Sequence, residues 1–197
     1  MKNETDEIVD CLLRGGIALV PTDTVYGLAV CPNFEEPVDR LYALKCRPRN
    51  LNLPIMVSSA DELEVLGVDI NDRVRKLLAS AFIPGALTLA MGFTNGPLVP
   101  WLMGREEVAI RIPDDRRLLS VLRKTGPLFV TSANRHGRST RETIQDILGQ
   151  LEGKPDIVID GGILQTVPST LVNCRHHPLK VEREGSISKT QLWDFIG

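Results

Sequence analysis

The sequence predicts an α/β protein in which helices pack on a mixed β-sheet. Helical patterns and short apolar strands alternate in the first half of the chain, and strands cluster in the last third. No repeat, low-complexity tract or Ser/Gly linker divides the 197 residues. A chain of this length can bury roughly 70% of the surface that its unfolded form exposes, so we expect a single domain over residues 1–197.

The first helix is expected over residues 4–14, because apolar residues recur on one face and two glycines follow. Residues 17–20, "IALV", include no polar residue and are closed by a proline, which predicts a buried strand. Amphipathic spacing predicts a second helix over about residues 36–44. The apolar segment "LPIMV", residues 53–57, predicts the next strand.

In the middle of the chain, Ser59-Ala60-Asp61-Glu62 has the spacing of a capping box and predicts the start of a short helix. Apolar residues at helical spacing predict a longer helix over residues 71–82. Two apolar runs, residues 86–91 and 108–112, then predict strands.

The last third begins with an expected helix over residues 116–124, which a glycine follows, and a strand over residues 128–130. A second capping box, Ser139-Thr140-Arg141-Glu142, predicts a helix that ends at about residue 150. A final helix is expected after Ser188. The late strands are expected over residues 156–160, 169–174 and 179–183.

Composition and charge exclude several classes of protein. The net charge of −2 and the pI of about 5.9 provide no overall field that would hold the chain on nucleic acid or an anionic membrane, so any anion site must be local. Four scattered cysteines without a C-x-x-C pair indicate a reducing compartment. The acidic first residues do not resemble a signal peptide, and no apolar run approaches the about 18 residues of a membrane helix. We therefore expect a cytoplasmic protein that does not contact a membrane.

Polar loops that follow predicted strands are the candidate binding sites, because a rigid sheet fixes their positions. The first, "PTDTVYGL" (residues 21–28), supplies two threonine hydroxyls, a carboxylate and a phenol, and its Gly27 allows close approach of the backbone. The alternative is an ordinary helix N-cap, with Thr22 or Asp23 as the capping residue and Tyr26 half buried.

The second candidate is the turn "LKCRPRN" (residues 44–50), which carries Lys45, Arg47 and Arg49. Its proline stiffens the turn, and arginine binds phosphate through two parallel hydrogen bonds while lysine acts as a point charge. A triphosphate is therefore the natural partner. A solvated turn at a helix C-terminus, where the dipole favours a cation, explains Lys45 or Arg47 singly and stays an alternative.

Four further segments carry polar residues near strand ends. Arg111 interrupts an apolar strand and must either meet an anion or reach solvent on an exposed strand face. The segment "VTSANRHG" (residues 130–137) offers hydroxyl and amide groups that bind phosphate, ribose or a base edge, or that form an ordinary turn. The other two clusters are Pro168-Ser169-Thr170 and the surroundings of Arg183.

Several familiar sites are absent from the sequence. It contains no P-loop and no G-x-G-x-x-G fingerprint, so a nucleotide must be held in another way. It contains no H-E-x-x-H motif and no paired Cys/His spacing, so we expect no metal cage in the protein.

Seven short motifs, taken together, resemble the YrdC/TsaC family from about Arg14 to Ser188. They occur in the order "PTDTVYGL", "LKCRP", "PGALTL", "VAIRIP", "TSAN" with a glycine three residues later, "PSTLV" and "EREG". The resemblance implies an open, twisted sheet flanked by helices, with a concave, positively charged groove. Longer members of the family carry an extra C-terminal domain, which we do not expect in a chain that ends at Gly197.

The resemblance also implies an activity. Family members are threonylcarbamoyl-AMP synthases, nucleotidyltransferases that use L-threonine, bicarbonate and ATP and release pyrophosphate. Mg²⁺ is expected on the phosphates of ATP, held mainly by phosphate and water. A separate transferase complex then moves the threonylcarbamoyl group onto an adenosine beside the anticodon of tRNAs.

The family's Lys-x-Arg and Ser-x-Asn pairs fall on Lys45, Arg47, Ser132 and Asn134. By resemblance, Lys45 and Arg47 are catalytic residues that hold the phosphates of ATP. Ser132 and Asn134 complete the nucleotide site, and Arg183 is a second arginine that contacts the nucleotide.

The resemblance places the threonine pocket at Thr22, Tyr26, Arg111 and Ser169, with Arg111 on the carboxylate of threonine. One position departs from the family. Members usually carry Lys or Asn four residues after the arginine of the Lys-x-Arg pair, which is Arg47 here, and this chain has Leu51 at that position. Either one nucleotide contact is lost, or a neighbour at position 49, 50 or 52 replaces it.

Two alternative functions stay open at this point. Leu51 leaves room for a paralogue with a different substrate, related to enzymes that adenylate a carbamoyl group derived from carbamoyl phosphate. A non-catalytic module that binds double-stranded RNA in the cationic groove is the second alternative, although the acidic pI and the aromatic content of 5% argue against it. Direct contact of the chain with tRNA is likewise left open.

Overall fold

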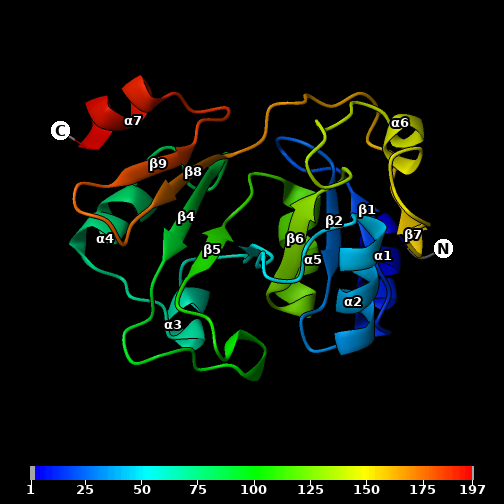
Figure 1. Cartoon of the computed structure of the whole chain (residues 1–197), viewed down its shortest axis with the longest axis horizontal. Helices are drawn as coiled ribbons and strands as arrows, with labels where there is room; N and C mark the ends of the chain where they lie inside the picture. The colour runs from blue at the N-terminus through cyan, green and yellow to red at the C-terminus, as the bar shows by residue number, and fades with distance from the viewer. Residues whose placement is uncertain (1–2, 197) are drawn as a thin grey trace.

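The computed structural model describes residues 3–196. Within this range, nine strands form one sheet in the order β7-β1-β2-β6-β3-β5-β4-β8-β9 (Figure 1). The pairs β1/β7, β3/β5 and β4/β8 are parallel and the other neighbours are antiparallel, which confirms the predicted mixed sheet. The strands are β1 (Ala18–Val20), β2 (Gly27–Val30), β3 (Ile55–Met56), β4 (Leu87–Met91), β5 (Val108–Arg111), β6 (Leu128–Ser132), β7 (Ile157–Val158), β8 (Thr170–Asn173) and β9 (Lys180–Arg183).

Helices cover both faces of this sheet. Ala18 and Val20 of β1 pack against α1 and α5, whereas Leu19 between them belongs to the larger core on the other face. Because both faces are covered, the strands read as continuous apolar runs rather than as alternating ones. The helices are α1 (Glu4–Leu13), α2 (Glu35–Leu44), α3 (Glu62–Leu66), α4 (Asp72–Leu78), α5 (Arg116–Thr125), α6 (Ile144–Leu148), α7 (Lys189–Ile196) and a 3₁₀ turn at Pro100–Leu102.

The middle helix is shorter than predicted. α4 begins after Asn71, whose side chain accepts a hydrogen bond from the Val74 N–H, but it ends at Leu78 instead of near residue 82. Ser80 explains the early end, because its hydroxyl donates to the Leu77 carbonyl at 2.6 Å and so competes with the next helical hydrogen bond.

Both predicted capping boxes are wrong. Glu62 does reach back from the first turn of α3, but its Oε1 accepts from the N–H and hydroxyl of Ser58 and not from Ser59. α6 begins after Thr143, whose hydroxyl accepts from the Asp146 N–H, four residues after the predicted Ser139 cap. The predicted spacing was present in each case, but another nearby residue makes the bond.

The strand β2 was not predicted, because its first two residues were taken as the end of a polar loop and its last two were assigned to no element. It is buried and pairs antiparallel with β1 and with β6, where Gly27 lies opposite Ser132. This register brings the β1–β2 connection, residues 21–26, beside the polar turn that follows β6. Two of the candidate loops are therefore neighbours in space.

Figure 1 shows β4, β8 and β9 with α4 and α7 in one half of the molecule, and β1, β2 and β6 with α1 and α2 in the other. The short strands β3 and β5 join the two halves within the sheet. Among the residues that the structure describes, no helix is both long enough and apolar enough to cross a membrane.

Candidate functional site

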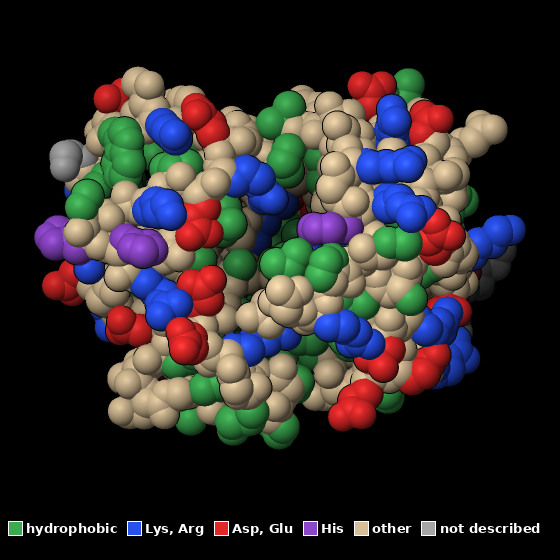
Figure 2. Space-filling model, viewed as in Figure 1, with side chains coloured by type: hydrophobic (Ala, Val, Ile, Leu, Met, Phe, Trp, Pro, Cys, Tyr) green, Lys and Arg blue, Asp and Glu red, His purple; other side chains and the backbone are tan. Residues whose placement is uncertain are grey.

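A cavity of about 490 Å³ opens between the two halves of the sheet. Figure 2 shows this face hollowed between the β4/β8/β9 half and the β1/β2/β6 half, with Lys and Arg side chains visible inside the hollow. The cavity lining includes seven of the predicted site residues: Thr22, Tyr26, Arg47, Arg111, Ser132, Ser169 and Arg183. The loops singled out in the sequence therefore converge on one space.

Arg111 lies at the end of β5 with only 5% of its surface exposed, so the exposed strand face considered as its alternative is wrong. Its Nε donates to the Gly85 carbonyl at 2.8 Å, and its Nη1 donates to Thr24 Oγ1 at 2.8 Å. Its Nη2 forms an ion pair with Asp23 Oδ1 at 2.7 Å. The N–H groups of Nη2 do not form a hydrogen bond of acceptable geometry with Asp23 or with any other described residue. Burial lowers the pKa of Arg111, and Asp23 opposes that shift.

The β1–β2 connection holds its shape through Thr22. The Thr22 hydroxyl donates to the Val25 carbonyl at 2.7 Å and accepts from the Thr24 N–H at 3.1 Å, which closes a local turn. Thr22 and Thr24 are both buried and both line the cavity. The segment is a turn between two strands, so the helix N-cap considered for it is wrong.

Tyr26 is 1% exposed rather than half buried. Its hydroxyl donates to the Gly162 carbonyl at 2.7 Å and accepts from the Gly161 N–H at 2.8 Å. Burial raises the pKa of this phenol. Tyr26 borders the cavity, but its hydroxyl is engaged by the segment that follows β7.

Ser169 and Arg183 form the wall of the cavity on the β8–β9 side. Arg183 Nε and Nη2 donate to the Ser169 carbonyl at 3.1 and 2.8 Å, and the Ser169 hydroxyl lies 2.7 Å from the Thr88 hydroxyl. Although Arg183 is an exposed residue, its guanidinium is turned inward, and burial followed by the positive charge of Arg111 lowers its pKa. Two guanidinium groups thus share this end of the cavity.

A glycine makes the close approach at this wall possible. A Cβ atom on Gly185 would lie 2.1 Å from the Pro168 carbonyl oxygen, so no larger residue fits without a backbone shift. The close approach allows the Thr170 hydroxyl to accept from the Gly185 N–H at 2.9 Å. The backbone around Ser169 is fixed in this way.

Arg47 borders the cavity on the other side. Its Nε and Nη2 donate to the carbonyls of Leu51 and Asn52, at 3.2 and 2.9 Å. Leu51 and Asn52, together with Asn50, also line the cavity. Burial lowers the pKa of Arg47.

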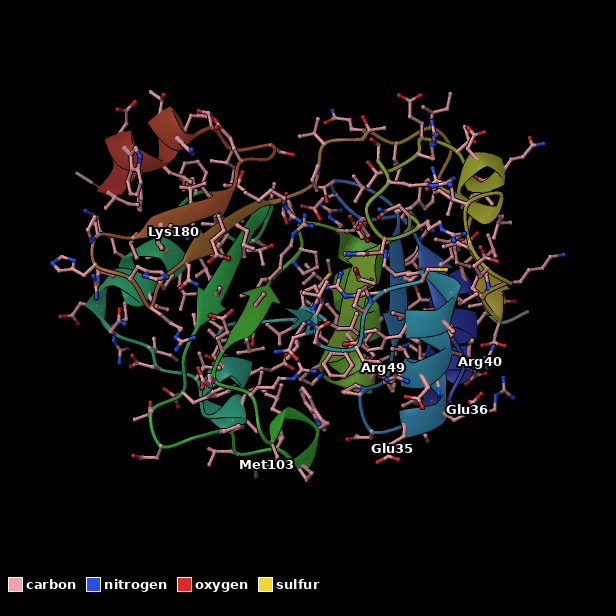
Figure 3. All side chains as sticks on the ribbon, in the orientation of Figure 1. Glu35, Glu36, Arg40, Arg49, Met103 and Lys180 are labelled. Atoms are coloured by element: carbon pink, nitrogen blue, oxygen red, sulfur yellow. The ribbon has the colours of Figure 1, made fainter. Side chains whose placement is uncertain are left out.

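Arg49 is turned away from the cavity. It pairs with Asp39, and its guanidinium carbon lies 4.6 Å from the centre of the Tyr42 ring. Figure 3 shows Arg49 beside α2. Of the three residues considered as replacements at position 51, Asn50 and Asn52 therefore face the cavity, and Arg49 does not.

Lys45 and Asn134 are not among the described residues that line the cavity. Lys45 is 2% exposed, and its ammonium contacts the Ser132 carbonyl and, at 2.6 Å, the Asn134 carbonyl. Burial and the charge of Arg47 lower the pKa of Lys45 to about 7. The role of Lys45 as a direct phosphate ligand stays a prediction from the resemblance.

Cys46 separates Lys45 from Arg47. Its φ of 48° is in the left-handed region, where helices commonly end and where glycine is favoured. α2 ends at Leu44, and the chain then turns so that Lys45 meets the backbone after β6 while Arg47 borders the cavity.

The sequence did not predict the roles of several residues of this site. Asp23 and Thr24, which orient Arg111, lie within the motif "PTDTVYGL", so their polar character was the available signal. Glu107 and Glu182 also line the cavity, and each accepts from the side chain of Asn173, at 3.4 and 2.9 Å. With two glutamates beside three arginines, the positive charge of the groove stays a prediction. Among the described residues, no group of three or more His, Cys, Asp or Glu side chains could hold a metal ion.

A family model described as "Telomere recombination", for Sua5, YciO and YrdC, matches residues 10–185. A threonylcarbamoyl-AMP synthase of Bacillus subtilis is 32% identical over 94% of this chain and 54% of the relative. A putative threonylcarbamoyl-AMP synthase of Methanocaldococcus jannaschii is 33% identical over 92% of this chain and 85% of that protein.

The fold is also similar to that of a solved structure. The crystal structure of P. abyssi Sua5 complexed with L-threonine superposes with a TM-score of 0.87 and 28% identity, over 100% of this chain and 59% of that chain. The chain thus spans little more than half the length of the Bacillus and P. abyssi proteins that it matches.

Proposed function

The chain belongs to the Sua5/YciO/YrdC family, and on that premise we propose that it synthesises threonylcarbamoyl-AMP from L-threonine, bicarbonate and ATP. Two curated relatives carry the name of this activity. In this proposal the enzyme is a nucleotidyltransferase of the cytoplasm. Its product passes to a separate transferase complex that modifies tRNA.

The geometry of Arg111 is the observation that carries the proposal. The guanidinium is buried at the cavity edge, and its Nη2 is ion-paired with Asp23 but has no hydrogen-bond partner among the described residues. Such a group fits a small carboxylate ligand. A relative with the same fold was crystallised with L-threonine. We therefore assign the carboxylate of threonine to Arg111, with Thr22, Tyr26 and Ser169 around the rest of the amino acid.

The nucleotide is assigned to the remaining walls. Arg47 and Ser132 border the cavity on one side and Arg183 on the other, and these groups suit the phosphates of ATP. Asn134 accepts a hydrogen bond from the Ser132 hydroxyl and would hold that hydroxyl in place. Leu51 has no polar group for the nucleotide, but its neighbours Asn50 and Asn52 also line the cavity and offer side-chain amides.

The reaction itself needs positioning more than a protein nucleophile. The threonine amine combines with bicarbonate to form a carbamate and water, and a carbamate oxygen then attacks the α-phosphorus while pyrophosphate leaves. The threonine carboxylate, the carbamate and the triphosphate repel one another, so Arg47, Arg111 and Arg183 would offset their charges and align the attack. Mg²⁺, when bound, would be held by phosphate oxygens and water and would add further positive charge.

Pyrophosphate release tests this proposal. We expect release from ATP to require both L-threonine and bicarbonate, and we expect Arg111→Gln to abolish that release. Release that ignores either substrate, or that responds to carbamoyl phosphate instead, would favour a paralogous carbamoyl-adenylating enzyme. Binding of double-stranded RNA or tRNA without any release of pyrophosphate would favour the non-catalytic module.

A further inference from the structure

Lys45 has a set of contacts that suits its charge. Its ammonium faces three oxygens from the end of β6 and the turn that follows it: the carbonyls of Ser132 and Asn134, and Asn134 Oδ1 at 3.5 Å. An ammonium group has three N–H donors and no acceptor, so it can serve all three oxygens. A neutral amine has two N–H donors, and its lone pair would face one of these oxygens.

Asn134 connects Lys45 to the cavity. Its Oδ1, which Lys45 contacts, also accepts from the Ser132 hydroxyl at 2.6 Å. Its Nδ2 donates to the carbonyls of Arg135 and Arg138, at 3.0 and 2.6 Å, and so fixes the loop beyond. Of this group, Ser132 is the residue that borders the cavity. The direction of the Ser132 hydroxyl therefore depends on contacts that Lys45 supports.

We propose that Lys45 is a positioning residue, whose charged ammonium fixes the Ser132–Asn134 turn for the nucleotide, and that nucleotide binding takes up a proton at Lys45 Nζ. The inference rests on the proposed function, because it assumes that the phosphates lie between Arg47 and Ser132. It differs from the direct phosphate contact that the family resemblance implies, since the ammonium is buried against backbone carbonyls.

The charges around Lys45 support the coupling. Burial and the neighbouring Arg47 lower its pKa to about 7, so both protonation states are populated near neutral pH. A polyphosphate beside Arg47 would oppose that repulsion and favour the protonated form. The other charged or titratable residues on the segments that contact Lys45 are Arg135, His136 and Arg138, with Glu152 paired to Arg135.

The sign of the pH dependence follows from linkage. If the complex binds a proton that the free protein lacks above about pH 7, affinity must fall as pH rises from there. Full uptake of one proton changes the affinity about tenfold per pH unit. We expect the dissociation constant of the wild type to rise at least about fivefold between about pH 7 and pH 8.5.

Calorimetry measures the proton directly. A non-hydrolysable ATP analogue with Mg²⁺ is titrated into the protein at about pH 8, in two buffers with different ionisation enthalpies. We expect the wild type to take up a substantial fraction of one proton. Lys45→Arg, whose guanidinium stays charged, should bind with no such uptake, and Lys45→Met should bind at least tenfold more weakly. Lys124→Met removes an exposed lysine that pairs with Asp6, and it should behave as the wild type does.

Each outcome decides a different point. Equal proton uptake in the wild type and Lys45→Arg, or a wild-type affinity that is flat from pH 7 to 8.5, would overturn the coupling. A wild type that does not bind the analogue would overturn the proposed function and the coupling with it. L-threonine binding to Lys45→Met reports whether that variant keeps a folded cavity. Should Lys45→Met not fold, the wild type and Lys45→Arg still decide the question.

Discussion

Arg111 Nη1 donates a hydrogen bond of 2.8 Å to Thr24 Oγ1, and this bond joins the end of β5 to the connection between β1 and β2. The preceding residue, Asp23, places its carboxylate 2.7 Å from Nη2 of the same guanidinium. One short segment thus provides both a neutral acceptor and a counter-charge. The direction of Arg111, and of any carboxylate that it binds, is set by that segment.

Thr24→Val tests this relationship. The substitution keeps the shape of the side chain but removes the acceptor for Nη1, which is worth about 1 kcal/mol. We expect the KM for L-threonine to rise about fivefold while the KM for ATP stays unchanged, as measured by pyrophosphate release. Thr24→Ser keeps the hydroxyl and serves as the matched control. An equal rise in both KM values would mean that Thr24 supports the whole cavity instead.

Arg183→Met should separate function from stability. Loss of a charge-assisted contact of about 1.5–3 kcal/mol would weaken ATP binding by about tenfold or more. The free energy of unfolding should change by less than about 1 kcal/mol, because relief of the repulsion from Arg111 offsets the lost bonds to Ser169. Isothermal titration and urea unfolding measure the two quantities. Strong destabilisation with unchanged ATP affinity would assign Arg183 a structural role.

Leu51→Lys should tighten ATP binding. Leu51 lines the cavity next to carbonyls that Arg47 contacts, so a lysine there adds a cation within reach of the proposed phosphates. We expect a several-fold lower KM for ATP. Leu51→Ala removes the same apolar side chain without adding charge. If the alanine and lysine variants behave alike, the neighbouring asparagines already supply the missing contact.

The stability of the free protein should rise with pH above neutrality. Lys45 has a folded-state pKa of about 7, below its ordinary value of 10.5, so between these values the unfolded chain binds more protons than the folded protein. The free energy of unfolding should therefore increase with pH, by up to about 1.4 kcal/mol per unit. Thermal unfolding from pH 7 to 9 measures the effect, and Lys45→Met should reduce the slope. A slope of the opposite sign would show that another group dominates.

Cys46→Gly should be tolerated, and Cys46→Val should not. The left-handed backbone at position 46 costs a non-glycine residue about 1–2 kcal/mol, and a β-branched side chain fits it least well. We expect the glycine variant to exceed the valine variant by more than about 1.5 kcal/mol in the free energy of unfolding. Urea denaturation at fixed pH compares the two. Equal stabilities would mean that the turn adopts another conformation in solution.

The sheet was largely predictable from the sequence, because most of its strands are buried on both faces and appear as apolar runs. β2 was missed, because its first two residues read as the end of the loop "PTDTVYGL" and the next two were assigned to no element. The capping boxes failed for a different reason. Side chains such as Thr143 and Ser58 compete for the same backbone groups, and spacing alone does not rank them.

The site was predictable as a set of loops, but not as a set of contacts. The motif order identified most of the residues that line the cavity. The burial of Lys45 could not be foreseen, because its partners are oxygens of Ser132 and Asn134, 87 and 89 positions along the chain. Every residue has a backbone carbonyl, so a sequence pattern does not indicate which carbonyls will contact a lysine. Arg49 likewise looked equivalent to Arg47 until the structure showed it against Asp39 and Tyr42.

The turn at Cys46 also has a practical consequence for labelling. Among the described residues, Cys46 is the exposed cysteine, whereas Cys31 and Cys174 are buried with pKa values raised to about 11 and 12. A thiol-reactive dye or spin label would therefore attach first at Cys46, between Lys45 and Arg47 in the chain. The protein thus carries a natural attachment point for a spectroscopic probe one residue before Arg47, which lines the cavity, and alkylating reagents used during purification would modify the same place.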